Sequence, residues 1–272
     1  MFEKIFFNLI EKKPLVQCIT NFVTVNDCAN IILACGGSPT MAHHKDEVEE
    51  IAECCQSLVL NMGVISDTEA MILAGKKCNS LNIPVVIDPV GMGASKLRNR
   101  TFEVLSENIH FAVIRGNVSE IKRIATGKGS TTGVDASEMD LITEDNIYDI
   151  ANMAKELSKK MDCIIVVSGP IDIVADKTTA YVIRNGHPIM SKITGSGCMS
   201  TALLGAFCGA NKDNILEASA AAVAAMGVCG ELAQRKMKEA GGGTMTFRMF
   251  LIDYISNMTS EMINKEINIE TV

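Results

Sequence analysis

The sequence predicts an α/β fold in which helices cover both faces of a central, mostly parallel sheet. Short runs rich in Val, Ile and Leu alternate with longer segments of helical periodicity, which is the pattern of βαβ units. The short runs are apolar on both faces, as strands of a doubly covered parallel sheet are. Five runs are candidate strands: Val16–Thr20, Leu58–Asn61, Val85–Asp88, Ala112–Arg115 and Ile164–Ser168.

The second half of the chain follows a different pattern. Residues 171–184 predict an antiparallel pair of strands that extends the sheet, with a turn near Asp176 and Lys177. From Gly197 to about residue 264 the periodicity is helical almost throughout. No Pro-rich or Ser-rich linker and no internal repeat divides the chain. We therefore expect residues 1–272 to form a single domain, with no separate lid domain.

Composition narrows the class of protein. The 272 residues are 47% hydrophobic, which is enough for a substantial core. The net charge of −7 argues against nucleic acid or an anionic membrane as a partner, because both attract basic surfaces. The alanine-rich run at 218–229 is too short and interrupted to span a membrane, so it predicts a buried helix.

The N-terminus and the cysteines indicate the compartment. The segment MFEKIFFNLIEKKP lacks the small-residue cleavage site of a secretory signal, which favours a cytoplasmic protein. The ten cysteines are scattered and form no Cys-x-x-Cys pair. We expect most of them to be buried thiols rather than disulfides or ligands of a structural metal.

The strongest functional signal is Thr194-Gly195-Ser196-Gly197-Cys198, which stands directly before a helical run. Free N–H groups at the start of a helix attract anions, so Gly195, Ser196, Gly197 and Cys198 are candidates for an anion hole around a transferring phosphoryl group. One alternative is a glycine loop that only permits close packing. A dinucleotide fingerprint is disfavoured, because position 200 is serine and the loop lies late in the chain.

Polar residues also follow two predicted strands. Asp88 ends one strand, while Arg115 ends the next and is followed by Asn117 and Glu120. Ligands of open α/β sheets bind at the carboxyl ends of strands, so Asp88 and Glu120 could organise magnesium, held largely through water. The alternative is an ordinary helix cap at Asn117 with a solvated Glu120.

A polar, glycine-rich stretch at residues 127–140 predicts a surface loop. It does not have the Gly-x-x-x-x-Gly-Lys-Ser/Thr spacing of a P-loop, since no glycine stands five residues before Gly127.

Seven segments together resemble the hydroxyethylthiazole kinase family of thiamin salvage, within the ribokinase-like superfamily. They are PLVQCITNFVT, GGSPTMAH, LVLNMG, PVVIDPVGMGAS, IRGNVSEI, IIVVSGPIDIVAD and ITGSGCMSTALLGAF. The resemblance covers most of the chain and implies a ribokinase-like fold. The superfamily's Asn-x-x-Glu motif is present at 117–120, and Cys198 replaces the Asp of the superfamily's Gly-x-Gly-Asp motif, as in the thiazole kinases.

The resemblance implies ATP-dependent phosphorylation of the primary hydroxyl of 4-methyl-5-(2-hydroxyethyl)thiazole, with Mg²⁺ as cofactor. It also implies a homotrimer with sites at the subunit boundaries. A kinase of another small alcohol, such as a hydroxymethylpyrimidine, is the alternative enzyme, and Cys198 argues against it. A catalytically silent binder is a third possibility, opposed by the retention of both motifs.

The resemblance also implies roles for single residues. Met41 and Gly195 would contact the thiazole. Cys198 would face the substrate hydroxyl as the catalytic residue and would either orient or deprotonate it, with the helix N-terminus favouring its thiolate. Arg115 and Ser168 would bind ATP, while Asp88 and Glu120 would organise magnesium. Taken singly, Met41 could be a core residue, Ser168 a turn residue and Arg115 a surface charge.

Overall fold

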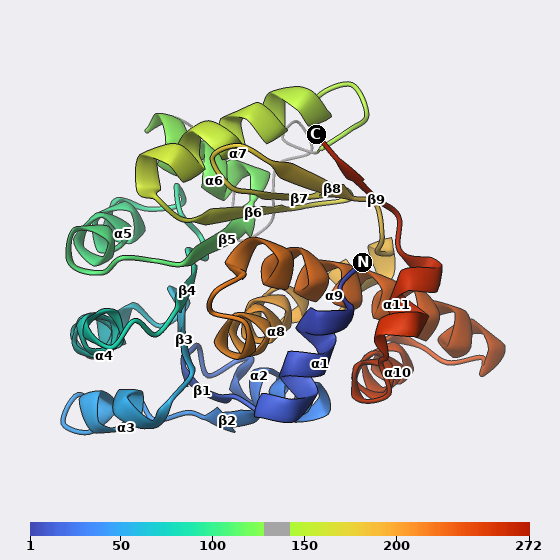
Figure 1. Cartoon of the computed structure of the whole chain (residues 1–272), viewed down its shortest axis with the longest axis horizontal. Coiled ribbons are helices and arrows are strands. Elements are labelled where there is room, and N and C mark those ends of the chain that lie inside the picture. The colour runs from blue at the N-terminus through green and yellow to red at the C-terminus, as the bar shows by residue number, and fades with distance from the viewer. Residues whose placement is uncertain (128–141) are drawn as a thin grey trace.

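The computed structural model describes residues 1–127 and 142–272. Within them, nine strands form one sheet in the order β2-β1-β3-β4-β5-β6-β7-β8-β9 (Figure 1). The parallel part consists of β2 (Ser38–Thr40), β1 (Leu15–Ile19), β3 (Ser57–Asn61), β4 (Val85–Asp88), β5 (Val113–Asn117) and β6 (Ile164–Ser168). The antiparallel extension consists of β7 (Asp172–Ala175), β8 (Ala180–Ile183) and β9 (Ile269–Thr271).

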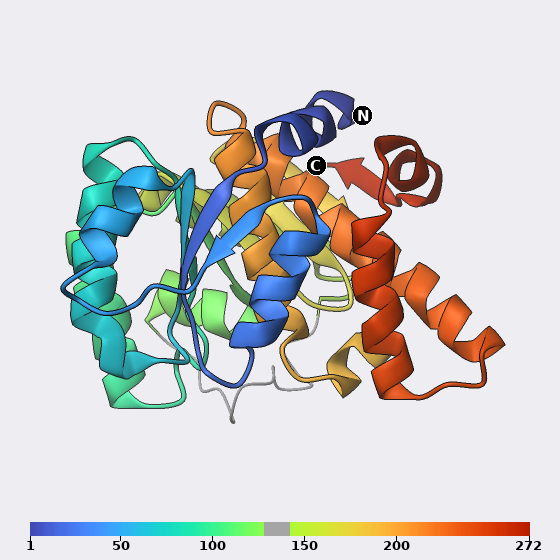
Figure 2. The same cartoon turned by 90° about the horizontal axis from the view of Figure 1, so that it is seen from below.

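Helices cover both faces of the sheet (Figures 1 and 2). One layer holds α3 (Val48–Cys54), α4 (Thr68–Ser80), α5 (Lys96–Asn108), α6 (Val118–Thr126) and α7 (Ile147–Met161), and η1 (Ile65–Asp67) precedes α4. The other holds α1 (Glu3–Lys12), α2 (Val25–Ala34), α8 (Ser196–Ala210), α9 (Ile215–Glu239), α10 (Thr244–Ser256) and α11 (Ser260–Glu266), and η3 (Pro188–Lys192) precedes α8.

Successive strand residues enter opposite cores, as the two-residue period of a strand requires. Val59 and Val86 pack with the layer of α8, whereas Leu58, Leu60 and Ile87 pack with the layer of α4. Both faces are therefore apolar, which explains the continuous hydrophobic runs of the central strands.

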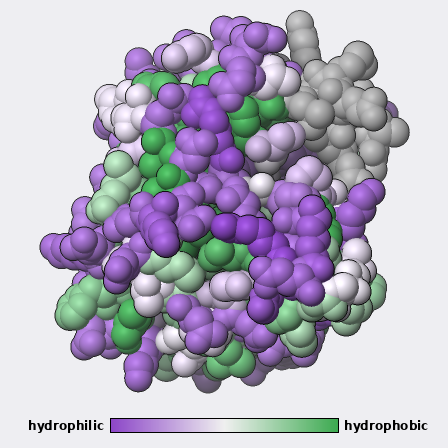
Figure 3. Space-filling view, turned by 90° about the vertical axis from the view of Figure 1, so that its right-hand side faces the viewer, coloured by the Kyte–Doolittle hydropathy of each residue, from purple (hydrophilic) through white to green (hydrophobic). Residues whose placement is uncertain are grey.

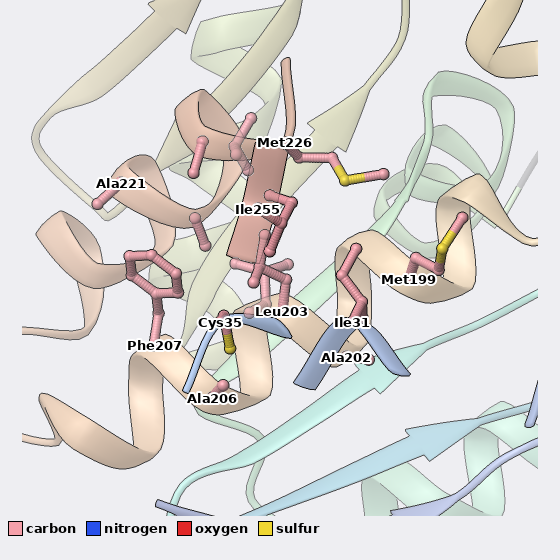
Figure 4. Packing of buried hydrophobic residues seen from close by; sticks show 14 of the residues in the cluster. Ile31, Cys35, Met199, Ala202, Leu203, Ala206, Phe207, Ala221, Met226 and Ile255 are labelled. Atoms are coloured by element: carbon pink, nitrogen blue, oxygen red, sulfur yellow. The ribbon is translucent and has the colours of Figure 1, made fainter. Parts of the chain in front are cut away.

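Helix α8 lies flat against the sheet because its inner surface is made of small residues. Ser57 Oγ donates a hydrogen bond of 2.7 Å to the Gly205 carbonyl, so the helix backbone approaches β3 closely. On the outer side, Ala202 and Leu203 meet Ile31 of α2 (Figure 4). Near the end of the helix the Phe207 ring packs edge-on against Phe6, with centroids 5.3 Å apart.

The predicted fold class is confirmed, and the five predicted strands agree with the observed ones to within two residues at each end. The hairpin and its turn are also observed: Asp176 N–H donates to the Thr179 carbonyl between β7 and β8. The sequence analysis missed β2 and β9, which are three residues long and partly exposed. Residues 128–140 of the predicted loop lie outside the described part of the chain.

Helix α9 contains the alanine-rich run that was predicted to be buried. It is the one helix in the described ranges that is long and apolar enough to cross a membrane, and most of its apolar stretch is buried against the rest of the protein. Hydrophilic residues cover most of the side of the molecule that carries α10 and α11 (Figure 3). Hydrophobic residues appear on that side in separate small patches.

The strand order reverses between β1 and β3. The chain runs from β1 to β2 on one side, and then places β3 on the other side of β1. In open α/β sheets, ligands bind at the carboxyl ends of the strands that flank such a switch point. The candidate site is therefore expected where β1 and β3 end, beside the N-terminus of α8.

Candidate active site

The N-terminus of α8 forms the floor of the candidate site. Gly195 precedes the helix with φ of 85°, a conformation that favours glycine. The first bond of the helix runs from the Met199 N–H to the Gly195 carbonyl. The N–H groups of Ser196, Gly197 and Cys198 have no acceptor within residues 1–127 and 142–272, so they are free to bind an anion.

Both glycines of the loop are required by close neighbours. A Cβ at Gly195 would lie 2.7 Å from Thr24 Cγ2, and a Cβ at Gly197 would lie 2.9 Å from Arg115 Nη1. The second contact shows that the Arg115 guanidinium lies against Gly197, in the first turn of α8. Two sources of positive potential therefore meet at one point.

Asp88 lies at the carboxyl end of β4 and is almost fully buried. Its Oδ2 accepts a hydrogen bond of 2.8 Å from Thr201 Oγ1 and forms an ion pair of 3.5 Å with Arg115 Nη1. Burial raises the pKa of Asp88, and Arg115 and Thr201 oppose this rise. Arg115 Nε is buried and has no hydrogen-bond partner in the described residues, so this guanidinium has donor capacity for a ligand.

Glu120 lies in the first turn of α6 and forms a capping box with Asn117, the residue that precedes the helix. Its Oε2 accepts the Asn117 N–H and its Oε1 accepts the Gly91 N–H, each at 2.8 Å. Asn117 is thus the helix cap of the alternative interpretation, but Glu120 is buried rather than solvated. Burial and the nearby Asp88 carboxylate raise the pKa of Glu120 to about 7.

Cys198 lies half-buried in the first turn of α8. Its Sγ accepts hydrogen bonds from Asn61 Nδ2 at 3.3 Å and from Asn21 Nδ2 at 3.5 Å. Burial and the Asp88 carboxylate raise the pKa of the Cys198 thiol, while Thr24, Asn21 and Arg115 act in the opposite direction. The raised pKa differs from the expectation that the thiolate is favoured here, and its largest cause is the burial of the thiol.

A model of the hydroxyethylthiazole kinase family matches residues 7–261. A hydroxyethylthiazole kinase of Clostridium acetobutylicum is 48% identical over 259 residues, which is 94% of each chain. One of Methanobrevibacter smithii is 43% identical over 267 residues, which is 95% of this chain and 92% of that one.

The chain belongs to the hydroxyethylthiazole kinase family. The solved structure of a hydroxyethylthiazole kinase protein from Pyrococcus horikoshii OT3 has a TM-score of 0.87 at 29% identity, covering 100% of this chain and 98% of that one. A Bacillus subtilis pyridoxal kinase has a TM-score of 0.56 at 16% identity, covering 79% and 90%, and so shares the fold. The ribokinase-like assignment is confirmed.

Ser168 and Met41, which the resemblance placed in the site, lie farther from Cys198, also at the carboxyl ends of the parallel strands. Ser168 ends β6 beside Asn117, and its Oγ donates to the Gly116 carbonyl at 3.3 Å. Met41 follows the edge strand β2 and packs partly against the core on the α8 side. The structure thus clusters Asp88, Arg115 and the 195–198 loop tightly. Ser168 and Met41 also lie at the carboxyl ends of the parallel strands, but on β6 and after β2, on opposite sides of this cluster in the strand order.

The sequence analysis missed Asn21, Asn61, Thr24 and Thr201. Asn61 ends β3 and Asn21 follows β1, so the strand-end argument used for Asp88 applied to both of them. Thr201 lies one helical turn after Gly197, which puts its hydroxyl on the side of α8 that faces Asp88. In the described residues no group of three or more His, Cys, Asp or Glu side chains is arranged to hold a metal ion.

The raised carboxyl pKa values predict how stability depends on pH in magnesium-free buffer. The pKa of Glu120 rises from 4.5 to about 7, and burial raises that of Asp172 from 3.8 to about 7. Over this window the folded protein keeps protons that the unfolded chain loses. The free energy of unfolding should therefore fall as the pH rises towards 7, and the contribution of these groups is fully lost above it.

Urea unfolding at about pH 5 and about pH 8, with a chelator present, measures this slope. Glu120→Gln removes one of the two titrating groups, so the variant should lose less stability between the two conditions than the parent. An equal or steeper loss in the variant would contradict the assignment to Glu120.

Proposed function

We propose that the protein transfers the γ-phosphoryl group of ATP to the primary hydroxyl of 4-methyl-5-(2-hydroxyethyl)thiazole, giving the thiazole phosphate and ADP for thiamin salvage. One observation carries the proposal: the Arg115 guanidinium and the Cys198 thiol both adjoin the first turn of α8, where the N–H groups of residues 196–198 have no acceptor among the described residues. An anion site and a proton acceptor thus adjoin in a chain of the thiazole kinase family.

The phosphate groups would be bound mainly by positive potential. The transition state of phosphoryl transfer is largely dissociative, so positioning and charge neutralisation supply most of the catalysis. The anion hole receives the transferring group. Arg115 offers its guanidinium charge, with Nη1 paired to Asp88 and Nε without a hydrogen-bond partner among the described residues. Ser168, at the end of β6, lies on the strand next to Arg115 and would contact the nucleotide.

Magnesium fits the carboxylate pair of this site. Both interactions of the Asp88 carboxylate within the described residues reach Oδ2, which leaves Oδ1 for a ligand or its water. Each Glu120 oxygen accepts one N–H and retains a second lone pair. Burial raises the pKa of Glu120, and repulsion by the Asp88 carboxylate raises it further. Mg²⁺ bound through water would neutralise both carboxylates and the phosphate oxygens.

In the chemical step the substrate O–H proton passes to the Cys198 sulfur as the alcohol oxygen bonds to the γ-phosphorus. The bond from that phosphorus to the β,γ-bridging oxygen breaks, and ADP leaves with the electron pair. The thiol then returns its proton to water. Because the thiol pKa is raised, the thiolate is a minor species at neutral pH and Cys198 assists without dominating.

The test is ADP release from Mg-ATP in the presence of the thiazole alcohol, a hydroxymethylpyrimidine or a sugar alcohol. The thiazole should give the highest kcat/KM. Gly197→Ala, whose new methyl group would displace Arg115, should lose most activity. Gly243→Ala is the matched control, since a Cβ there meets nothing within 4 Å. Faster turnover of the pyrimidine would favour the alternative kinase. If none of the three alcohols caused ADP release, both kinase functions would be rejected.

Glu120→Gln is expected to lower kcat by about 10-fold or more while thiazole binding changes little. A carboxylate that organises magnesium matters most when charge develops in the transfer. Steady-state kinetics across a magnesium titration measures the effect, and part of the loss should return at high magnesium. Unchanged kcat at every magnesium concentration would remove Glu120 from the site.

We also propose a cytoplasmic, single-domain subunit that forms a homotrimer with sites at subunit boundaries. The ten cysteines, all free, suit a reducing compartment. Phe22 and Val23 are exposed apolar residues directly after Asn21, so the site opens onto a surface that a neighbouring subunit could cover.

Mixed subunits are expected to complement each other if the site is shared. A Met41→Ala variant and the Cys198→Ala variant, each of low activity alone, should regain part of the parental activity when mixed, because some subunit boundaries then carry one intact set of residues. Activity is measured across mixing ratios, and subunit exchange is verified with differently tagged chains. Exchange without recovery at any ratio would mean that Met41 and Cys198 serve the same subunit's site.

A further inference from the structure

We propose that Asn21 and Asn61 form an amide pair that fixes the Cys198 sulfur as a hydrogen-bond acceptor and so positions it to receive the substrate proton. The inference rests on the proposed function and adds two positioning residues to it. Both residues lie at the switch point, where β1 and β3 end, and both are buried.

The backbone determines which way the Asn61 amide points. Its Oδ1 accepts the Gly63 N–H at 2.8 Å and Asn21 Nδ2 at 3.2 Å. A backbone N–H can only donate, so the oxygen of this amide must face Gly63. The Nδ2 group therefore faces Cys198 Sγ, 3.3 Å away.

The Asn21 amide is oriented in the same way by Thr24. Its Oδ1 accepts both the backbone N–H and the hydroxyl of Thr24, at 3.1 and 3.2 Å. Its Nδ2 is consequently the end that donates to Asn61 Oδ1 and to the Cys198 sulfur. Both amides thus present donors to Sγ. A turned Asn61 amide would leave the Gly63 N–H without its acceptor. A turned Asn21 amide would place its NH₂ group against the Thr24 N–H, whose other acceptor is the Asn21 carbonyl at 3.3 Å.

This arrangement has a consequence for the charge on the sulfur. Hydrogen-bond donors favour the thiolate over the thiol. Thr24 and Asn21 lower the pKa of the Cys198 thiol in this way, against burial and the Asp88 carboxylate, and the Asn61 N–H donor acts in the same direction. The two amide donors also occupy the sulfur from the β1 and β3 side, so a thiol hydrogen, and hence a proton arriving from the substrate, lies on another side. A pair retained only for packing would not need to direct two buried amide donors at a weak acceptor.

A double-mutant cycle tests whether Asn61 acts through the sulfur. Asn61→Leu keeps the branched shape of the side chain and removes the donor, so kcat should fall about 5- to 10-fold with KM nearly unchanged. In a Cys198→Ala background the same change should lower kcat less than about 2-fold, because no sulfur remains to be positioned. Equal losses in both backgrounds would overturn the proposal, since Asn61 would then act on the substrate or the fold.

Alkylation of Cys198 by iodoacetamide at one pH provides a readout independent of kinase activity. The exposed Cys54 of the same chain is the internal standard, and peptide mass spectrometry follows both residues. Asn61→Leu and Asn21→Leu should each slow the reaction of Cys198 relative to Cys54 by about 5- to 10-fold. If one of the two variants fails to fold, the other still tests the proposal.

The control is Asn79→Leu. The Asn79 amide also makes two backbone hydrogen bonds, both to His110 at 2.8 Å. Asn79 lies near the end of α4 and His110 shortly before β5, so this pair is at the amino ends of the strands, away from the site. This variant should leave the alkylation ratio and kcat unchanged. An unchanged ratio in both Asn21→Leu and Asn61→Leu would overturn the amide pair, even in an active kinase. A slowed ratio with no ADP release from any alcohol would instead reject the kinase proposal and retain the pair.

Discussion

Cys198→Ala is expected to lower kcat by about 10²-fold without abolishing turnover. General base catalysis contributes about 10²- to 10⁴-fold, and the effect should lie at the lower end because a dissociative transition state needs little help from a base. The raised pKa of the thiol points the same way, since only a small fraction is ionised at neutral pH. The anion hole and Arg115 remain intact in the variant and supply the residual rate.

Cys198→Asp is the informative partner of that change. A carboxylate at this position is ionised without assistance and would accept the same Asn21 and Asn61 donors. We expect it to remain active and to equal or exceed the parent. Measurement of kcat for both variants, with thermal melts to verify folding, separates a base from a packing residue. A fully active Ala variant beside a folded, inactive Asp variant would defeat the assignment of Cys198.

Gly205→Leu is expected to cause the largest loss of stability. A Cβ at Gly205 would lie 2.3 Å from Val59 Cγ2 and 3.2 Å from Val16 Cγ1, both in the sheet beneath α8. Overpacking a close-packed core costs about 1–3 kcal/mol, and here a whole side chain would push the helix off two strands. The free energy of unfolding should fall by at least about 3 kcal/mol.

Urea unfolding measures this effect, and Gly243→Ala again provides the control with open space around its Cβ. Activity should fall together with stability in the Leu variant, because the same helix carries the anion hole at its N-terminus. A loss below about 0.5 kcal/mol, within the range of ordinary surface substitutions, would show that α8 does not lie in close contact with β3.

The central strands were predictable because each is buried on both faces and reads as an apolar run. The edge strands β2 and β9 were not, since three partly exposed residues carry no such pattern. In the site, Asp88 and Arg115 were found by their position at strand ends, and the 195–198 loop by its glycines. Asn21 and Asn61 stand in equivalent places, but an asparagine after a strand is common at turns and gave no distinct signal.

The amino-acid sequence determined the α/β class, the order of the central elements and the residues that could bind phosphate, because these depend on local periodicity and on glycines at particular positions. The tertiary structure alone decided how those residues interact. Burial raised the pKa values of Cys198 and Glu120, an effect that depends on how much water the folded chain removes from each side chain. The pairing of Asn21 with Asn61 depends on two strands that only the folded sheet brings side by side.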